Sequence, residues 1–332
     1  VLALIDRPPL EYASRFGLRP LSVAGNTETQ LKFKFPVLNE LPLSVVDIQT
    51  ISRLDNLRVP NLAFGQTVSA ETLVLKVNTD GMELSGQARI GDVAAAIKWT
   101  ELFGADEKYP RRYEAKAVLS QAQVDAIGVI KTSPFLEGSL AANVAVLQPR
   151  TGSTEIDLKL ALKDTKMWVP GFRWRKPTGR EGVASFRLLV APDGKLSIPE
   201  FSVDSPGLTA KGSVKFDRYR KFTQMDIGKF ILGRTDISGR VGSMPDGKLN
   251  VEIYGATLDA VNFLEADETG NPDDKVKNDA MMLPPINLLV NIDRVWFDDK
   301  NPVDRLTGGL KGDGVEWQKV NLSGLVGDNQ KV

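Results

Sequence analysis

The sequence contains no cysteine and no histidine. Without cysteine the chain has no disulfide, thiol nucleophile or cysteine-bound zinc, although either redox compartment remains compatible with the sequence. Without histidine it has no serine-type triad with histidine and no HExxH zinc site. Lysine plus arginine and aspartate plus glutamate both number 42, so the formal net charge is zero. No overall field therefore attracts nucleic acid, and we expect no nucleic-acid partner.

The chain also lacks a long apolar run at its beginning. It opens VLALIDRPPL, with no initiator methionine, no basic segment and only five residues before the first charge. This opening is not that of a signal peptide or a membrane-spanning helix. We interpret the sequence as an internal fragment of a longer protein.

Most of the remaining sequence alternates apolar and polar residues with a period of two, as in 73–77, 156–162, 249–254 and 286–293. Such alternation is typical of β-strands with one apolar face. Turn sequences with Asp-Gly or Pro-Gly separate the runs at Thr79–Gly81, Pro192–Gly194, Ser205–Gly207, Pro245–Gly247 and Gly312–Gly314. The predicted fold class is all-β: an elongated, curved, mostly antiparallel sheet that forms an open groove, with one or two short capping helices.

Two ten-residue stretches share one pattern, GMELSGQARI at 81–90 and GLTAKGSVKF at 207–216. In each, a leading glycine follows a turn residue, where a positive φ is expected. The inner glycines, Gly86 and Gly212, lie within a strand, where glycine marks a bulge, a bend or a close approach. Shorter repeats, such as Leu-Ser-Gly at 84–86 and 322–324, favour stacked, similar hairpin units.

The predicted organisation has four parts. Residues 1–119 form a first β-groove segment, and residues 120–264 a second one with a short helix near 120–128. Residues 265–280 form a flexible polar loop, because 265–279 lacks apolar periodicity. Residues 281–332 continue the strands to a truncated C-terminal end. A further short helix is expected at 10–16, after Pro8-Pro9.

No motif indicates catalysis. The acidic pairs Asp267/Glu268, Asp273/Asp274 and Asp298/Asp299 are adjacent in sequence, and adjacent strand residues point to opposite faces. The segment 267–279 lacks the order of acids and glycine that a calcium loop needs. We therefore predict no enzymatic activity, no metal and no cofactor, and a glycan hydrolase that uses carboxylates alone is the weakest alternative.

The basic and aromatic segment WVPGFRWRKPTGR at 168–180 has two interpretations. Arg173, Trp174 and Arg175 could contact lipid headgroup phosphates or a partner protein, since arginine binds phosphate in a bidentate manner and tryptophan favours amphipathic boundaries. The ordinary alternative is a strand with a packed aromatic face and a solvated charged face.

Three sets of residues resemble the AsmA-like superfamily of Gram-negative bacteria, and its YhdP-like and TamB-like branch in particular. They are the glycine-containing strands at 81 and 207, the segment from Leu119-Ser120 through Gly128 to 135–138, and the stretch from Phe230 through 233–236 to 258–260. The resemblance implies a periplasmic repeating β-groove, anchored to the inner membrane by a segment not present here. It also implies phospholipids or other acyl lipids as partners, conducted between the inner and outer membranes, and envelope proteins as further possible partners.

The family has no catalytic residues to carry over, so the groove-lining candidates come from alternation within this sequence. They are Leu73, Leu75, Val77, Met82, Leu84, Ala88, Ile90, Ile156, Leu158, Leu160, Leu162, Leu208, Ala210, Val214, Phe216, Leu249, Val251, Ile253, Leu288, Val290 and Ile292. The alternative function is a structural or adaptor module of the cell envelope, with a closed sheet, that binds a partner protein. Ala184–Val190 is apolar on both faces, so alternation does not set its phase.

Overall fold

The computed structural model describes residues 22–37, 46–63, 65–104, 107–127, 135–169, 172, 174–261, 284–314, 316–326 and 330–331. The predicted helix at 10–16 and the predicted loop at 265–280 lie outside these residues. Strand accounts for 72% of the structure and helix for 3%, so the predicted all-β fold is confirmed. The sheet is curved and open, and it does not close into a barrel.

The chain divides into two compact units, Val1–Val129 with Ala141–Ile156, and Ile130–Leu140 with Asp157–Val332. In the first unit the strands are β1 (Ala24–Lys34), β2 (Asp47–Ala63), β3 (Gln66–Val77), β4 (Gly81–Ile90), β5 (Val93–Leu102) and β6 (Arg111–Ser120). Each pairs antiparallel with the next in sequence order. Strands β7 (Leu136–Gln148) and β8 (Thr154–Ala161) each contribute residues to both units.

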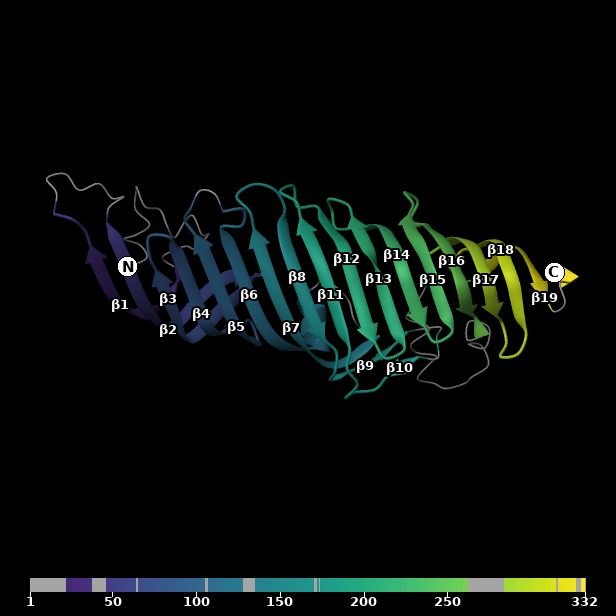
Figure 1. The fold of residues 1–332 in the computed structure, drawn as a ribbon, viewed down its shortest axis with the longest axis horizontal. Helices are drawn as coiled ribbons and strands as arrows, with labels where there is room; N and C mark the ends of the chain where they lie inside the picture. Colours follow the sequence, from purple (N-terminus) through teal and green to yellow (C-terminus); the bar gives the residue numbers. More distant parts are fainter. Residues whose placement is uncertain are drawn as a thin grey trace. The chain divides into compact units, whose positions relative to one another are not determined.

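In the second unit, nine strands follow in sequence order and lie side by side in Figure 1. They are β11 (Val183–Val190), β12 (Leu196–Ser205), β13 (Leu208–Phe216), β14 (Phe222–Leu232), β15 (Thr235–Ser243), β16 (Leu249–Asp259), β17 (Ile286–Trp296), β18 (Pro302–Gly312) and β19 (Trp317–Val326). A short β20 (Gln330–Lys331) pairs with β19. The small strands β9 (Thr165–Trp168) and β10 (Arg175–Lys176) form a separate hairpin, which pairs with the first residues of β7.

Within the runs β1 to β6 and β11 to β20, one pairing departs from the antiparallel pattern. β16 and β17 run parallel, from Leu249 opposite Ile286 to Asp259 opposite Trp296. A parallel pair cannot be joined by a tight hairpin turn and needs a longer connection between its strands. Ala260 and Val261, which follow β16, are buried, and Ala260 belongs to a cluster with Ile292 and Val295.

The predicted helix at 120–127 is confirmed as α3 (Gln121–Ile127). The Ser120 Oγ accepts a hydrogen bond from the Gln123 backbone N–H (3.3 Å), and the Ser120 N–H donates to the Gln123 side chain (2.9 Å). This reciprocal capping box satisfies two backbone donors at the start of the helix. The Gln123 side chain also donates to Asp92 (3.1 Å), which attaches the helix to the turn between β4 and β5.

The predicted positive φ of the leading glycine is confirmed at Gly207 (+79°) but is wrong at Gly81. The turn before Gly81 is stabilised differently, because the Asn78 side-chain oxygen accepts hydrogen bonds from the N–H groups of Asp80 and Gly81. Gly81 is needed for close approach instead. A Cβ atom there would lie 2.3 Å from the carbonyl oxygen of Glu101 on the neighbouring strand.

Of the alternatives predicted for the inner glycines, a bulge, a bend or a close approach, the structure shows close approach, and both glycines stand opposite a bulge of a neighbouring strand. Gly86 has a φ of +149° and stands opposite Leu73, where the pairing of β3 with β4 shifts. Gly212 lies at a shift in the pairing of β13 with β14. Its missing side chain leaves room for the Phe201 ring, which a Cβ atom would approach to 2.9 Å. Bulges bend the strands that carry them and increase their twist, which accounts for the curvature of the sheet.

Replacement of Gly86 by alanine should lower the free energy of unfolding by about 1–3 kcal/mol, because an L-residue is strained at this φ. The new Cβ would also meet the Leu73 side chain at 2.8 Å. Gly242→Ala is the matched control, since nothing lies within 4 Å of a Cβ there and its φ is ordinary for a strand. The measurement is the urea midpoint followed by circular dichroism. Equal midpoints for the two variants would contradict the role assigned to Gly86.

Candidate functional site

The first unit carries a continuous apolar face across β3 to β6. Leu75 stands opposite Leu84, which stands opposite Trp99, which in turn stands opposite Tyr113. The adjacent row runs from Leu73 through Gly86 and Ile97 to Ala115. Leu73 is 1% exposed, whereas its neighbour Val74 on the other face is 36% exposed. We call this surface the first apolar face.

The second unit repeats this arrangement over more strands, and we call it the second apolar face. Three adjacent rows cross the sheet, and every residue in them is apolar or glycine. The middle row extends over β11 to β19 and consists of Phe186, Phe201, Gly212, Ile227, Gly239, Ile253, Val290, Gly308 and Leu322. The rows on either side are Ala184, Val203, Ala210, Phe230, Ile237, Gly255, Ile292 and Leu306, and Ile198, Val214, Met225, Val241, Val251, Leu288, Leu310 and Val320.

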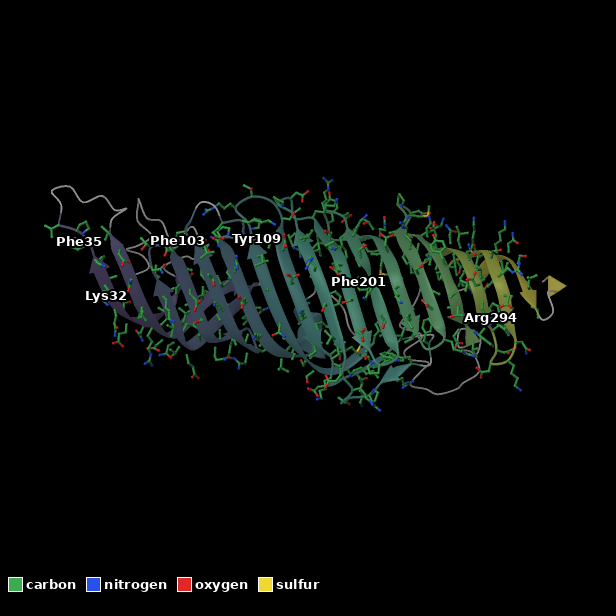
Figure 2. The ribbon with its side chains drawn as sticks, viewed as in Figure 1. Lys32, Phe35, Phe103, Tyr109, Phe201 and Arg294 are labelled. Carbon is green, nitrogen blue, oxygen red and sulfur yellow. The ribbon has the colours of Figure 1, made fainter. Side chains whose placement is uncertain are left out.

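Glycines in the middle row allow a neighbouring strand or one of its side chains to approach closely. Gly212 lies beneath the Phe201 ring, which stacks on Phe186 with 6.5 Å between ring centroids. Figure 2 labels Phe201 on this part of the sheet. At Gly239 and Gly308 a Cβ atom would instead meet the backbone of the neighbouring strand, 2.4 Å from the Glu252 carbonyl oxygen and 2.1 Å from that of Asn321. The result is an apolar surface without interruption by charge.

The opposite face of each unit is polar and carries cross-strand ion pairs. Lys98 pairs with Glu83 at 2.9 Å in the first unit, and Arg240 pairs with Asp226 at 2.6 Å in the second. Hydrogen bonds from Arg240 and Gln224 lower the pKa of Asp226, so this carboxylate is charged at neutral pH. The two faces therefore differ in chemistry over all of these strands.

The predicted lining residues of β3, β4, β13, β16 and β17 lie on the two apolar faces. Leu73, Leu75, Val77, Met82, Leu84, Ala88 and Ile90 lie on the first, and Leu208, Ala210, Val214, Phe216, Leu249, Val251, Ile253, Leu288, Val290 and Ile292 on the second. Of the predicted residues in and after β8, Ile156, Leu158 and Leu160 are half-buried, and Leu162 is 2% exposed.

Sequence reasoning missed several residues of the second apolar face, including Ile198, Phe201, Ile227 and Phe230. Each lies beside a shift in strand pairing, between Ile198 and Phe201 on β12 and between Ile227 and Phe230 on β14. A bulge changes which residues point to a given face, so simple alternation fails across it. The phase of Ala184–Val190 was also undetermined, and the structure places Ala184 and Phe186 on the apolar face.

The segment 168–180 packs largely against its own unit. Phe172 contacts Phe230 of the second apolar face, with 5.6 Å between ring centroids. Trp174 donates its indole N–H to the carbonyl oxygen of Pro206 at 3.0 Å. Arg175 is exposed and stands opposite Trp168, and Arg173 lies outside the described residues. Of the two interpretations of this segment, the aromatic residues fit the packed one.

A buried lysine holds this hairpin in place and was not anticipated. Lys176 is 3% exposed, and its ammonium group donates to the carbonyl oxygens of Leu162 and Thr165, the latter at 2.8 Å. Burial lowers the pKa of Lys176, while Asp164 and Glu181 act in the opposite direction. The sequence does not predict this burial, because a lysine next to arginines in a basic segment is typical of a solvent-exposed residue.

Lys176→Met should reduce the free energy of unfolding by about 1–3 kcal/mol, because buried carbonyl groups would lose their donor. Lys166→Met is the control, since Lys166 is exposed on the same hairpin. Thermal unfolding of the two variants compares them directly, and equal melting temperatures would show that the ammonium contacts contribute nothing.

An ion pair interrupts the first apolar face at one rim. In the row next to Leu84, Met82 stands opposite Glu101, and Glu101 stands opposite Arg111. The Arg111 guanidinium donates to both carboxylate oxygens of Glu101, at 2.7 and 3.2 Å. The two side chains are 24% and 12% exposed. The rim is thus polar but locally neutral. Tyr109, which Figure 2 labels, precedes Arg111 by two residues.

Two neighbouring side chains form hydrogen bonds with this ion pair. Gln148 accepts a longer hydrogen bond from Arg111 (3.4 Å), and Trp99 donates to Glu101 (3.4 Å). The hydrogen bonds to Glu101 raise the pKa of Arg111, and burial raises the pKa of Tyr113 beside it. At neutral pH the arginine is therefore charged and the tyrosine is not.

Arg111→Met should reduce the free energy of unfolding by roughly 1–3 kcal/mol, because the Glu101 carboxylate would remain half-buried without its main partner. Adding Glu101→Leu should restore most of that loss, since the double variant contains no unpaired charge there. A double-mutant cycle measured by urea unfolding tests this coupling. Additive losses would mean that the two groups act independently.

Among the described residues, no group of three or more acidic side chains is placed to bind a metal ion. No helix in the described part of the chain is long and apolar enough to span a membrane. No protein-family model matches this sequence, and no curated protein or solved structure shows significant similarity to it. The resemblance to the AsmA-like superfamily therefore stays a prediction.

Proposed function

We propose that this protein binds the acyl chains of phospholipids along its apolar faces and conducts them between the inner and outer membranes of a Gram-negative cell. In this proposal it is a periplasmic segment of a protein anchored in the inner membrane. The observation that carries the proposal is the middle row of the second apolar face, which crosses nine strands without a polar side chain. Apolar surface of that extent favours an apolar ligand.

The mechanism needs no chemical step. Each methylene group buried against the apolar face contributes about 0.8 kcal/mol, so a chain of many methylenes binds well. The three rows of the second apolar face have similar chemistry along their length, so neighbouring binding positions differ little in free energy. A lipid can then slide between positions while its headgroup stays in water at the rim.

The alternative, an adaptor that binds an envelope protein through the segment 168–180, receives less support. Phe172 and Trp174 are engaged with Phe230 and Pro206 of the same unit. The aromatic surface that a partner would need is therefore already occupied. Arg175 is exposed, but one solvent-exposed charge contributes little affinity.

The direct test is native mass spectrometry of the protein purified from bacterial membranes under mild conditions, with organic extraction as a check. We expect bound phospholipid in the parent protein. The double variant Leu84→Asp and Ala210→Asp should lose most of it, because each change places a charge on one of the apolar faces.

The matched control is the double variant Ser85→Asp and Ser202→Asp. It adds the same charge close to the same positions, since Ser85 follows Leu84 and Ser202 lies on β12, the strand next to Ala210. Both serines point to the polar faces, where Ser85 stands opposite Lys98 and Ser202 opposite Lys211. It should retain lipid. If the Leu84/Ala210 variant is folded by circular dichroism and carries as much lipid as the parent, the proposal is wrong.

A further inference from the structure

Among the described strands, β1 pairs on one side with β2 and is an edge strand, and it exposes several large apolar side chains. Leu31, Phe33 and Phe35 are each more than half exposed, and Val37 is 98% exposed. These residues follow one another at every second position, so in an extended chain they point to the same side. Every residue of β1 is exposed. We call the segment 31–37 the β1 edge.

The apolar side of the β1 edge lies on the same side of the sheet as the first apolar face, with hydroxyl side chains of β2 between them. Leu31 stands opposite Thr50, which stands opposite Val77, and Val77 stands opposite Met82. The neighbouring row includes Thr29, Ser52 and Leu75, with a hydrogen bond of 2.9 Å between Thr29 and Ser52. Leu31 and Phe33 therefore lie on the same side of the sheet as Leu75 and Leu84.

Two lysines alternate with these apolar residues. Lys32 and Lys34 are exposed on the opposite side of the strand, and Figure 2 labels Lys32 and Phe35 at this edge. Segment 31–37 has no acidic residue. The nearest counter-charge across the strand pair is Asp47, which stands opposite Lys34 and accepts a hydrogen bond from Gln49 (3.5 Å).

We propose that the β1 edge docks on the surface of an anionic phospholipid bilayer. Phenylalanine and leucine side chains would enter the boundary between headgroups and acyl chains, while the lysine ammonium groups extend to lipid phosphates. The same lysines disfavour pairing with a second β-strand, because charged side chains on an edge strand oppose sheet-to-sheet association. The charge pattern thus selects a bilayer over a strand of another protein.

This docking goes beyond lipid binding by the apolar faces, because it concerns where the protein meets a membrane. Leu31 and Phe33 lie on the side of the sheet that carries the first apolar face, so a docked β1 edge would bring that face to the bilayer boundary. An acyl chain that leaves the bilayer would then reach the face across β2, which presents the small hydroxyl side chains of Thr50 and Ser52 in these two rows.

The test is co-flotation of the whole chain with vesicles of phosphatidylcholine containing phosphatidylglycerol, compared with vesicles of phosphatidylcholine alone. We expect binding to the anionic vesicles that weakens with added salt. Lys32→Gln with Lys34→Gln should weaken partitioning by about fivefold for each lysine removed. Asp47→Asn should strengthen it, because it removes the counter-charge opposite Lys34.

Phe33→Ser with Phe35→Ser should also reduce vesicle binding, since the apolar anchors would be lost. The matched control is Val118→Ser with Leu289→Ser, which removes two exposed apolar side chains, 65% and 56% exposed, from other strands. The control should bind as the parent does. All variants are compared by circular dichroism to confirm that they fold.

Three results would overturn the inference: no binding to anionic vesicles, binding that the Lys32/Lys34 and Phe33/Phe35 variants leave unchanged, or binding reduced equally by the Val118/Leu289 control. Self-association through the β1 edge without vesicle binding would point to strand pairing and would also overturn it. Lipid occupancy of the purified protein is measured separately by native mass spectrometry. If the purified protein contains no lipid but still binds vesicles, the proposed lipid binding is wrong and this inference stands. If it contains lipid but does not bind vesicles, this inference is wrong and the proposed lipid binding stands.

Discussion

The structure depends on one constraint, which is that strand pairing must keep apolar side chains on a single face from strand to strand. A shift of one residue in register would move a whole strand's apolar set to the polar face. In the second unit, nine strands satisfy the constraint although several pairings contain a shift. Bulges between Ile198 and Phe201 on β12 and between Ile227 and Phe230 on β14 keep the apolar residues before and after them on the common face, and they also curve the sheet.

Glycine has a specific part in this arrangement. Gly86 adopts a backbone conformation that other residues avoid, and Gly212 leaves the space that the Phe201 ring fills. An apolar surface built from large residues alone would push neighbouring strands apart or open gaps between side chains. Glycines placed among the large residues keep the strands paired and the surface continuous, which is the property that the proposed transport of acyl chains requires.

The charges discussed above lie on the polar faces, at a rim, in the β9–β10 hairpin and on β1, and none lies in the three rows of the second apolar face. Ion pairs such as Arg240 with Asp226 lie on the polar face, and the Arg111–Glu101 pair closes one rim of the first apolar face without adding net charge. Lys32 and Lys34 lie at the β1 edge. A net charge of zero over the whole chain thus coexists with a local pattern that separates apolar, neutral polar and basic surfaces.

The sequence by itself determined the all-β class, the α3 cap at Ser120, most of the turns and the apolar side of strands such as β3 and β4, because each depends on residues near one another in the chain. Tertiary structure alone decided the parallel pairing of β16 with β17, the burial of Lys176 and the membership of Phe201 and Ile227 in the second apolar face. These features depend on which strand lies beside which and on where the pairing shifts. Alternation along one strand contains no information about either, since it is the neighbouring strand that sets register and packing.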